Sequence, residues 1–276
     1  MKKIISLLVV LLSIFTCVSL TSCGTNSANT IVVGTMAQPG EPILNSVKEA
    51  LKEKGYDLKI QLFSDFNTPN IALAEGSIDA NLFQHEPFLN TYNEKNNTDL
   101  FCAAKLYDCV YGGYSKKNIA TVDEIPSRAK ITIANDSSNM IRCLKILEAS
   151  GLIELNELPA TVNATDINSY IKTNEKQLKI TPIATNMIAA SLNDEDVYLG
   201  LVNATFAIAA KLTSNELICQ EEDPEHVNAN ILACRADDKD SAKIQALVEV
   251  LTSDATATYI EDTFSGTIVP YFVSLI

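Results

Sequence analysis

The chain has 276 residues, of which 47% are hydrophobic and 20% charged, which is ordinary for a soluble globular protein of one two-lobed domain or two domains. Its formal charge is −13, and because Lys2 and Lys3 are the only charged residues among the first 22, the remainder carries −15. Such an acidic surface repels nucleic acid and anionic lipid, so neither is expected as a partner.

The first 22 residues are predicted to be a lipoprotein signal peptide. Two lysines precede an apolar run, Ile4 to Phe15, which is short for a membrane span and is followed by polar chain. A bacterial lipobox is resembled by the stretch Leu20-Thr21-Ser22-Cys23-Gly24. The resemblance implies that Cys23 carries a diacylglycerol and becomes the new N-terminus after cleavage. Residues 23–30 would then be a lipidated tether, and two acyl chains anchor stably. An ordinary signal peptide with a chance cysteine is the alternative.

Beyond the signal peptide and Cys23, five cysteines remain: Cys102, Cys109, Cys143, Cys219 and Cys234. Their number is odd and no pair has Cys-x-x-Cys spacing, so we expect small core residues rather than a disulfide scaffold. The only histidines are His85 and His226, and nothing has the spacing of a zinc site. No metal and no other cofactor is expected.

Strand and helix patterns alternate in the first part of the chain. The predicted elements are strands over 30–34, 57–63 and 78–83, and helices over 41–54 and from Thr68 to Gly76. Thr68 would cap the second helix with Pro69 at its first position, Gly76 would end it, and Pro87 would open the next. This order is typical of a mostly parallel sheet with helices on its faces.

The same alternation continues to the C-terminus. The predicted strands cover 100–106, 110–115, 130–134, 178–183, 196–202, 216–220 and 229–235, and the predicted helices cover 140–149, 203–211, 241–251 and 255–262. Thr121 to Glu124 fits a capping box before a further short helix. Roughly ten strands alternating with helices predict two α/β lobes. The periodicity leaves open where the chain crosses between them.

Aromatic and amide side chains gather where predicted strands end and helices begin. These residues are Phe66, Asn67, Phe83, Gln84 and His85. In an open α/β sheet the ligand crevice lies at such strand ends. With Tyr107, the rings could form an apolar slot for a thioether, because sulfur is attracted to aromatic rings. Ordinary core packing is the alternative for each ring.

Arg142 and Asn203 are the candidate polar contacts to a ligand. Arg142 is one of three arginines and is expected in the first turn of a helix, after the polar cluster 135–139. A guanidinium grips a carboxylate bidentately, and a helix N-terminus adds free N–H groups; a surface salt bridge is the alternative. Asn203 follows a strand and could serve both an ammonium and a carboxylate, or simply cap a helix.

Catalysis has little support in the sequence. It contains no nucleophile elbow, P-loop or G-x-G-x-x-G. Asp65 and Asp79 are candidate acids without an identifiable nucleophile, and His85 has no obvious Ser or Cys partner. The chain is therefore not expected to be an enzyme, although one on a two-lobed fold, using His85 or Asp65, is a distant alternative.

Several motifs resemble the substrate-binding lipoproteins of methionine ABC transporters. Phe63 to Asn70 fits F-x-D-[YF]-x-x-P-N, and Ala72 to Leu89 fits A-L-A-x-G-x-I-D-A-N-x-F-Q-H-x-P-[YF]-L. Further matching stretches are Gly113–Lys117, Ile133–Leu144, Gly151–Ile153, Val202–Ala207 and Phe264–Pro270. The resemblance covers roughly residues 31 to 272, nearly the whole mature chain.

The resemblance implies a type II periplasmic-binding-protein fold, with two α/β lobes around a hinged ligand cleft. Lobe one would take residues 31–114 and 225–276, and lobe two residues 115–224. Arg142 would hold the ligand carboxylate, Asn203 its amino and carboxylate groups, and Asn139 would lie beside them. The side-chain pocket would be lined by Phe66, Phe83, His85 and Tyr107.

The implied function is capture of L-methionine by a monomer that is lipid-anchored on the extracytoplasmic face of the membrane and delivers it to an ABC importer. There are three departures from the family pattern: Phe66 where tyrosine is frequent, Asp108–Tyr111 in place of an apolar, proline-bearing segment, and Ala189-Ala190 in place of Pro-Arg. The first two lie near the expected pocket and leave the ligand's side chain open. Another apolar amino acid, methionine sulfoxide or a methionine dipeptide is the nearer alternative. A surface antigen or adhesin with a vestigial cleft is a further one.

Overall fold

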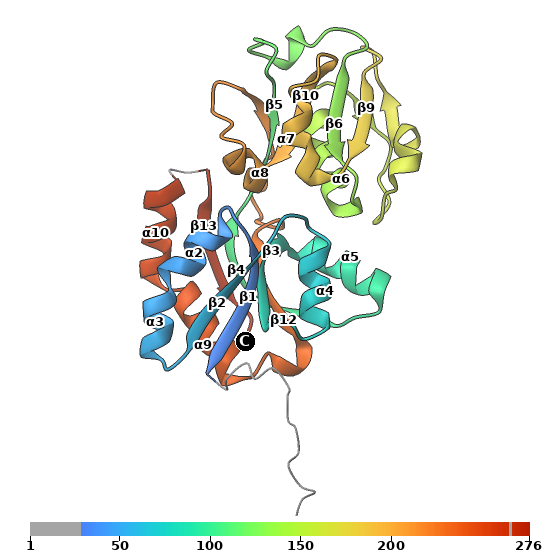
Figure 1. Cartoon of the computed structure of the whole chain (residues 1–276). Coiled ribbons are helices and arrows are strands. Elements are labelled where there is room, and N and C mark those ends of the chain that lie inside the picture. Colours follow the sequence, from blue (N-terminus) through green and yellow to red (C-terminus); the bar gives the residue numbers. More distant parts are fainter. Residues whose placement is uncertain (1–28, 265–266) are drawn as a thin grey trace, which may run out of the picture.

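A computed structural model describes residues 29–264 and 267–276, which form two α/β lobes stacked along one long axis (Figure 1). The predicted signal peptide (1–22), the predicted lipidation site Cys23 and the tether up to residue 28 lie outside the described residues. Within the described ranges, no helix is long and apolar enough to cross a membrane.

A six-stranded sheet organises the first lobe, in the order β13-β4-β12-β3-β1-β2. Its strands are β1 (Thr30–Met36), β2 (Asp57–Phe63), β3 (Ala80–His85), β4 (Leu100–Asp108), β12 (Asn230–Arg235) and β13 (Val269–Ser274). β1 is parallel to β2 and β3, and its residues are all buried because helices cover both faces of the sheet. The carboxyl ends of these three strands point toward the second lobe (Figure 1).

Six helices cover this sheet: α2 (Gly40–Ser46), α3 (Lys48–Glu53), α4 (Thr68–Ala74), α5 (Glu86–Asn96), α9 (Ala242–Leu251) and α10 (Asp254–Phe264). The single helix predicted over 41–54 is wrong, because the backbone at Val47 (φ −96°, ψ 0°) divides it into α2 and α3. The break is invisible to periodicity, since Leu44, Val47 and Leu51 are all buried and continue one apolar stripe.

The start of α4 also differs from the prediction in one detail. Pro69 lies in the first turn as expected, and Gly76, with φ +77°, ends the segment. The Thr68 hydroxyl, however, does not cap the helix but donates to Asp65 Oδ2 at 2.9 Å. Asp65 Oδ1 accepts from the backbone N–H groups of Asn67 and Thr68, so Asp65 satisfies the donors that begin this helix.

A five-stranded sheet organises the second lobe, in the order β11-β5-β10-β6-β9. Its strands are β5 (Tyr111–Tyr114), β6 (Lys130–Ala134), β9 (Lys179–Ile183), β10 (Val197–Asn203) and β11 (Leu217–Gln220). Its helices are α6 (Ser137–Ala149), α7 (Ile188–Ser191) and α8 (Ala204–Ala209), and β7 (Glu154–Leu155) and β8 (Ile171–Thr173) form a separate ribbon. The predicted capping box of Thr121 and Glu124 is present but opens only a short 3-10 turn, Val122–Glu124.

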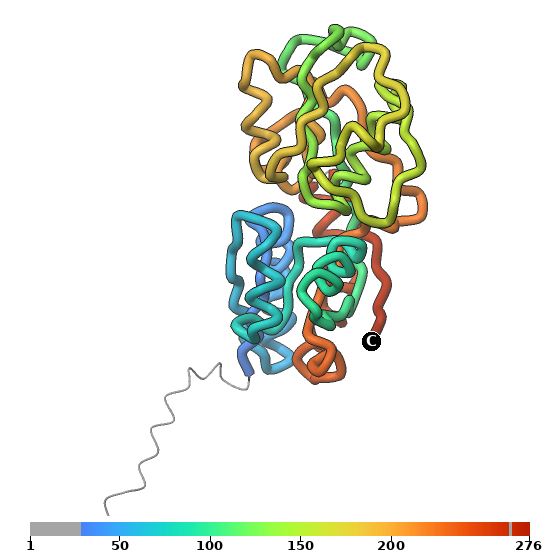
Figure 2. Tube along the Cα trace, turned by 90° about the vertical axis from the view of Figure 1, so that its right-hand side faces the viewer, coloured from blue at the N-terminus to red at the C-terminus, as the bar shows by residue number. Residues whose placement is uncertain are grey.

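The chain passes between the lobes twice, through residues 109–110 and 221–229 (Figure 2). The expected first boundary, after residue 114, needs correction: β5 pairs antiparallel with β10 and β11, so residues 111–114 belong to the second lobe. Periodicity cannot show this, because a four-residue strand looks the same in either sheet. The two crossing segments lie side by side, where Glu221 N donates to Tyr111 O at 2.9 Å.

The five described cysteines are free; Cys219 is half-buried and the other four are buried. Burial raises the pKa of all five thiols. Since the thiolate is the reactive form, we expect Ellman's reagent to leave them almost unmodified in the folded protein at pH 8 and to modify all five after denaturation. Rapid modification of several of these thiols without denaturant would contradict this burial.

Candidate ligand-binding site

A small cavity lies between the two lobes. It is lined by Phe66, Phe83, Gln84, His85, Phe88 and Asn230 from the first lobe and by Asn139 and Asn203 from the second. Five of the seven residues predicted from the sequence thus come together here, from segments far apart in the chain. The other two are close by: Arg142 lies next to Asn139, and Tyr107 lies beneath Asn230.

The apolar end of this cavity is built from phenylalanine rings. The Phe66 ring centroid lies 5.7 Å from that of Phe83 and 6.1 Å from that of Phe88. From the second lobe, Phe206 on α8 brings its centroid to 5.0 Å from Phe66. The rings meet in tilted and edge-on arrangements, which favour aromatic contact. Two of the rings predicted for an aromatic slot, Phe66 and Phe83, thus lie together, and sequence reasoning missed their neighbours Phe88 and Phe206.

Three buried amides hold the first-lobe wall of the cavity in place. Asn70 on α4 and Gln84 on β3 exchange two hydrogen bonds of 2.7 Å, and Asn81 Nδ2 donates to Asn70 Oδ1 at 2.9 Å. Gln84 Nε2 also donates to Asn81 Oδ1 at 3.0 Å. Because all three are nearly inaccessible to water, the network ties the helix after Phe66 to the strand that carries Phe83.

His85 links the lobes as a neutral hydrogen-bond donor. Its Nδ1 accepts from the Phe88 backbone N–H at 3.1 Å and caps α5, which places the ring proton on Nε2. Nε2 lies 3.0 Å from Asn139 Oδ1 on the other lobe. Burial, and then the nearby Arg142 charge, lower the pKa of His85 to about 3, so the ring is uncharged at neutral pH.

The depressed pKa makes His85 a source of acid sensitivity. Between pH 6.5 and about 3 the unfolded chain protonates this ring and the folded chain does not, so stability falls as the pH decreases, by up to about 1.4 kcal/mol per pH unit. We expect His85→Gln to flatten the dependence of the unfolding free energy on pH in this window, measured by urea denaturation. His226→Gln is the control, and equal slopes in wild type and His85→Gln would contradict the assignment.

Asn139 is held in one orientation by the residue that caps α6. Asp136 accepts from the Asn139 backbone N–H at 3.0 Å and from Asn139 Nδ2 at 2.9 Å, which leaves Asn139 Oδ1 facing His85 and Arg142. The helix begins at Ser137, earlier than predicted, so Arg142 lies in its second turn and not its first. The first-turn N–H group of Asn139 is therefore occupied by Asp136.

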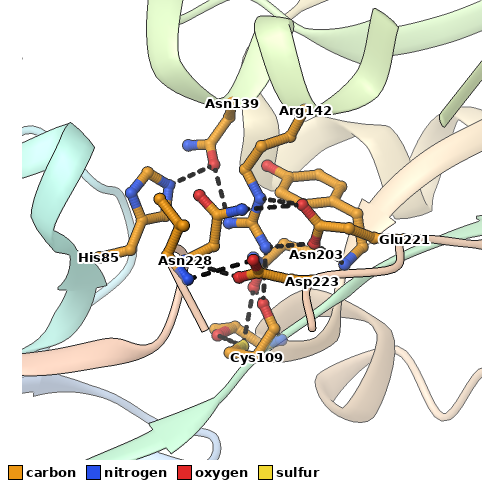
Figure 3. A network of polar contacts seen from close by, with 11 residues as sticks. His85, Cys109, Asn139, Arg142, Asn203, Glu221, Asp223 and Asn228 are labelled. Atoms are coloured by element: carbon orange, nitrogen blue, oxygen red, sulfur yellow. Dashed lines mark hydrogen bonds and ion pairs between the residues drawn. The ribbon is translucent and has the colours of Figure 1, made fainter. Parts of the chain in front are cut away.

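Arg142 donates two hydrogen bonds to a carboxylate that sequence reasoning missed. Its side chain is 4% exposed and pairs with Glu221, which is 8% exposed. Arg142 Nε donates to Glu221 Oε1 at 2.7 Å, and Nη2 donates to Glu221 Oε2 and, at 2.9 Å, to the Cys109 carbonyl (Figure 3). The alternative of a surface salt bridge is thus wrong, because the pair is buried.

Two further amides are oriented by neighbours outside the cavity. Asn203 caps α8, and its Oδ1 accepts from Thr205 N at 3.0 Å, so its Nδ2 donors remain for the cavity. Asn230 Nδ2 donates to the Tyr107 hydroxyl at 3.2 Å, so its Oδ1 remains as an acceptor. Tyr107 is completely buried and is not part of the lining. Sequence reasoning missed Asn230, although the start of a strand antiparallel to β3 must lie at the same sheet edge as His85.

A larger groove of about 860 Å³ lies on the outside of the junction, between α5, α6 and residues 220–228. Arg142 and Glu221 are among its lining residues. It contains no aromatic side chain, and around it stand exposed charged residues such as Glu94 and Lys145. The small cavity has a volume of only about 10 Å³, but aromatic and oriented polar groups converge on it, and on that chemical ground it is the better candidate for an amino-acid site.

Comparison with known proteins decides the family. The family model for NlpA lipoprotein matches residues 31–272. The chain belongs to the NlpA lipoprotein family. The resemblance to methionine transporter lipoproteins found in the sequence is thereby confirmed.

Other members of the NlpA lipoprotein family are named for methionine binding. The chain is 36% identical to the methionine-binding lipoprotein MetQ of Bacillus subtilis, over 90% of this chain and 92% of that protein. It is 29% identical to the D-methionine-binding lipoprotein MetQ of Escherichia coli K12, over 90% of this chain and 91% of that protein. Both names describe binding proteins.

Solved structures of related NlpA-type lipoproteins share the fold. A putative lipoprotein from Clostridium difficile has a TM-score of 0.82 and 36% identity, covering 89% of this chain and all of that one (100%). A nutrient-binding protein from Burkholderia cenocepacia, bound to methionine, has a TM-score of 0.81 and 32% identity. The match covers 88% of this chain and 100% of that one. The expected two-lobed periplasmic-binding-protein fold is confirmed.

Proposed function

We propose that this protein captures L-methionine in the cavity between its lobes and delivers it to the permease of an ABC importer. The observation that carries the proposal is the convergence of phenylalanine rings with the oriented amides of Asn203 and Asn230 at one interlobe cavity, with Arg142 next to it. The lipoprotein names of its relatives support attachment through Cys23 on the extracytoplasmic face of the membrane, and we propose that the protein acts as a monomer.

The polar groups fit an α-amino acid in its zwitterionic form. Asn203 Nδ2 and Arg142 Nη1 are donors available to the carboxylate, and Asn230 Oδ1 is an acceptor available to the ammonium group. The thioether would lie among Phe66, Phe83 and Phe88, since sulfur is attracted to aromatic rings at about 5 Å. Methionine bound in this way touches both lobes.

Ligand contact with both lobes favours the closed arrangement. Two hydrogen bonds already join the lobes at this cleft, between His85 and Asn139 and from Asn186 Nδ2 to Ser64 O at 3.2 Å. In this proposal the permease distinguishes the closed, loaded protein from the open one.

Calorimetry tests the proposal. The protein is unfolded and refolded to remove bound ligand, and then titrated with L-methionine, D-methionine, leucine, methionine sulfoxide and Gly-Met. We expect tight binding of L-methionine and at least about ten-fold weaker binding of leucine, whose side chain offers no sulfur to the rings. If only another ligand gave a heat of binding, that ligand would replace L-methionine as the proposed substrate. If none of them gave a heat of binding, the binding role would be refuted.

A further inference from the structure

We propose that Glu221 is a specificity-determining residue of this site: it holds Arg142 in place and cancels its charge, so that the site selects a ligand of zero net charge. The inference rests on the proposed function, because it assumes that an amino acid occupies the interlobe cavity. It concerns a residue in the second crossing segment, outside the cavity lining.

Glu221 occupies the centre of a network that joins α6 to both crossing segments (Figure 3). Besides the two bonds from Arg142, its Oε2 accepts from Tyr111 N at 3.1 Å, in the first residue of β5 after the first crossing. Its Oε1 accepts from Asn228 Nδ2 in the second crossing at 3.2 Å. A carboxylate that is 8% exposed and accepts four hydrogen bonds is strongly held.

This arrangement determines which part of Arg142 can meet a ligand. Glu221 takes the Nε and Nη2 donors, and the Cys109 carbonyl also binds Nη2, while the guanidinium plane lies over the Tyr111 ring at 4.8 Å. Only Nη1 is left, with a single long contact of 3.4 Å to Asn139 Oδ1. The Nη1 donor therefore lies next to Asn139, which does line the cavity, and the bidentate grip expected from the sequence is directed to Glu221.

The charged groups next to the cavity are each paired or hydrogen-bonded locally. None of its lining residues carries a charge, since His85 is neutral. The Arg142 cation is balanced by Glu221, and the Asp136 anion is offset by the N-terminus of α6 and the amide donors of Asn139. Without Glu221, Arg142 would be a buried cation beside the ligand without its ion-pair partner.

A unit charge near the ligand acts oppositely on ligands of opposite net charge. Removing the Glu221 charge strengthens the binding of an anionic ligand and weakens the binding of a cationic one. For a zwitterion the two effects nearly cancel. A purely structural role for Glu221 would change the affinities of all three ligand types alike. The pattern across ligands thus separates charge selection from loss of folding.

The experiment compares three ligands of similar size: L-methionine, the anion 4-(methylsulfanyl)butanoate, which lacks the ammonium group, and the cation L-methioninol, which lacks the carboxylate. Their dissociation constants are measured by competition calorimetry on the purified mature protein in detergent. The variants are wild type, Glu221→Gln, which keeps an acceptor oxygen, and Glu222→Gln, which removes an exposed charge from the adjacent residue.

In Glu221→Gln we expect two changes in the ratios of dissociation constants. The preference for methionine over the anion should fall about ten-fold, and the preference for methionine over the cation should rise about ten-fold. Glu222→Gln should leave both ratios within about two-fold, because solvent screens an exposed charge. Unchanged ratios in Glu221→Gln, or tighter methionine binding there, would overturn the inference while leaving the proposed function intact. A wild type that binds no methionine would instead overturn the proposed function.

Discussion

Arg142→Ala is expected to abolish methionine binding and to lower the free energy of unfolding by about 3–5 kcal/mol. The stability loss arises because Glu221 would keep its buried carboxylate without a counterion, and the Cys109 carbonyl would lose its donor. The binding loss arises because the ligand carboxylate would lose a charged donor and Asn139 would lose a neighbour that helps to position it. Urea denaturation measures the first effect and calorimetry with L-methionine the second.

The matched control is Lys145→Ala on the same helix. Lys145 is exposed and also borders the outer groove, so its removal should change the unfolding free energy by no more than about 0.5 kcal/mol. If Arg142→Ala and Lys145→Ala were equally stable, the buried ion pair would not exist in solution. If Arg142→Ala still bound methionine with wild-type affinity, Arg142 would not contact the ligand.

Asn70→Ala is expected to be the second most damaging change, with a loss of about 3 kcal/mol or more in unfolding free energy. It removes the partner of two of the three Gln84 hydrogen bonds and of one Asn81 bond, at a place that water does not reach. Methionine binding should weaken as well, because the network connects the segments that carry Phe66 and Phe83. Thermal and urea unfolding, followed by calorimetry on the folded fraction, measure both effects.

Asn90→Ala is the corresponding control, since Asn90 is exposed on α5. It should be within about 0.5 kcal/mol of wild type. A loss of less than about 1 kcal/mol in Asn70→Ala would mean that the remaining amides find other partners, and that the first-lobe wall is not fixed by this network.

Local sequence patterns predicted most elements but not all of their limits. The alternation of Leu58, Ile60 and Leu62 placed β2 at its observed bounds, because a half-buried edge strand shows the period of two. The break at Val47 and the sheet membership of β5 went unseen, since neither changes the apolar pattern. β13 (Val269–Ser274) was missed because its half-buried residues show no clean alternation.

The residues of the candidate site also fall into those that the sequence predicted and those that it did not. Phe66, Phe83, Gln84 and His85 were predictable because they stand near strand ends before helices, where an α/β sheet forms its crevice, whereas Phe88 and Asn230 were missed. Glu221 was not predictable either, since it lies in a loop segment of acidic residues that resembles a solvated surface. Its role depends on the close approach of Glu221 to Tyr111, 110 residues apart in sequence, which only tertiary structure reveals.

The most direct measurement of the central claim is an anomalous diffraction experiment. The protein, produced with ordinary methionine, is crystallised with L-selenomethionine, so that the ligand is the only source of selenium. We predict one anomalous peak between the lobes, about 5 Å from the rings of Phe66, Phe83 and Phe88. A peak in the outer groove between α5 and α6, or no peak on the protein, would contradict the assignment of the interlobe cavity as the methionine site.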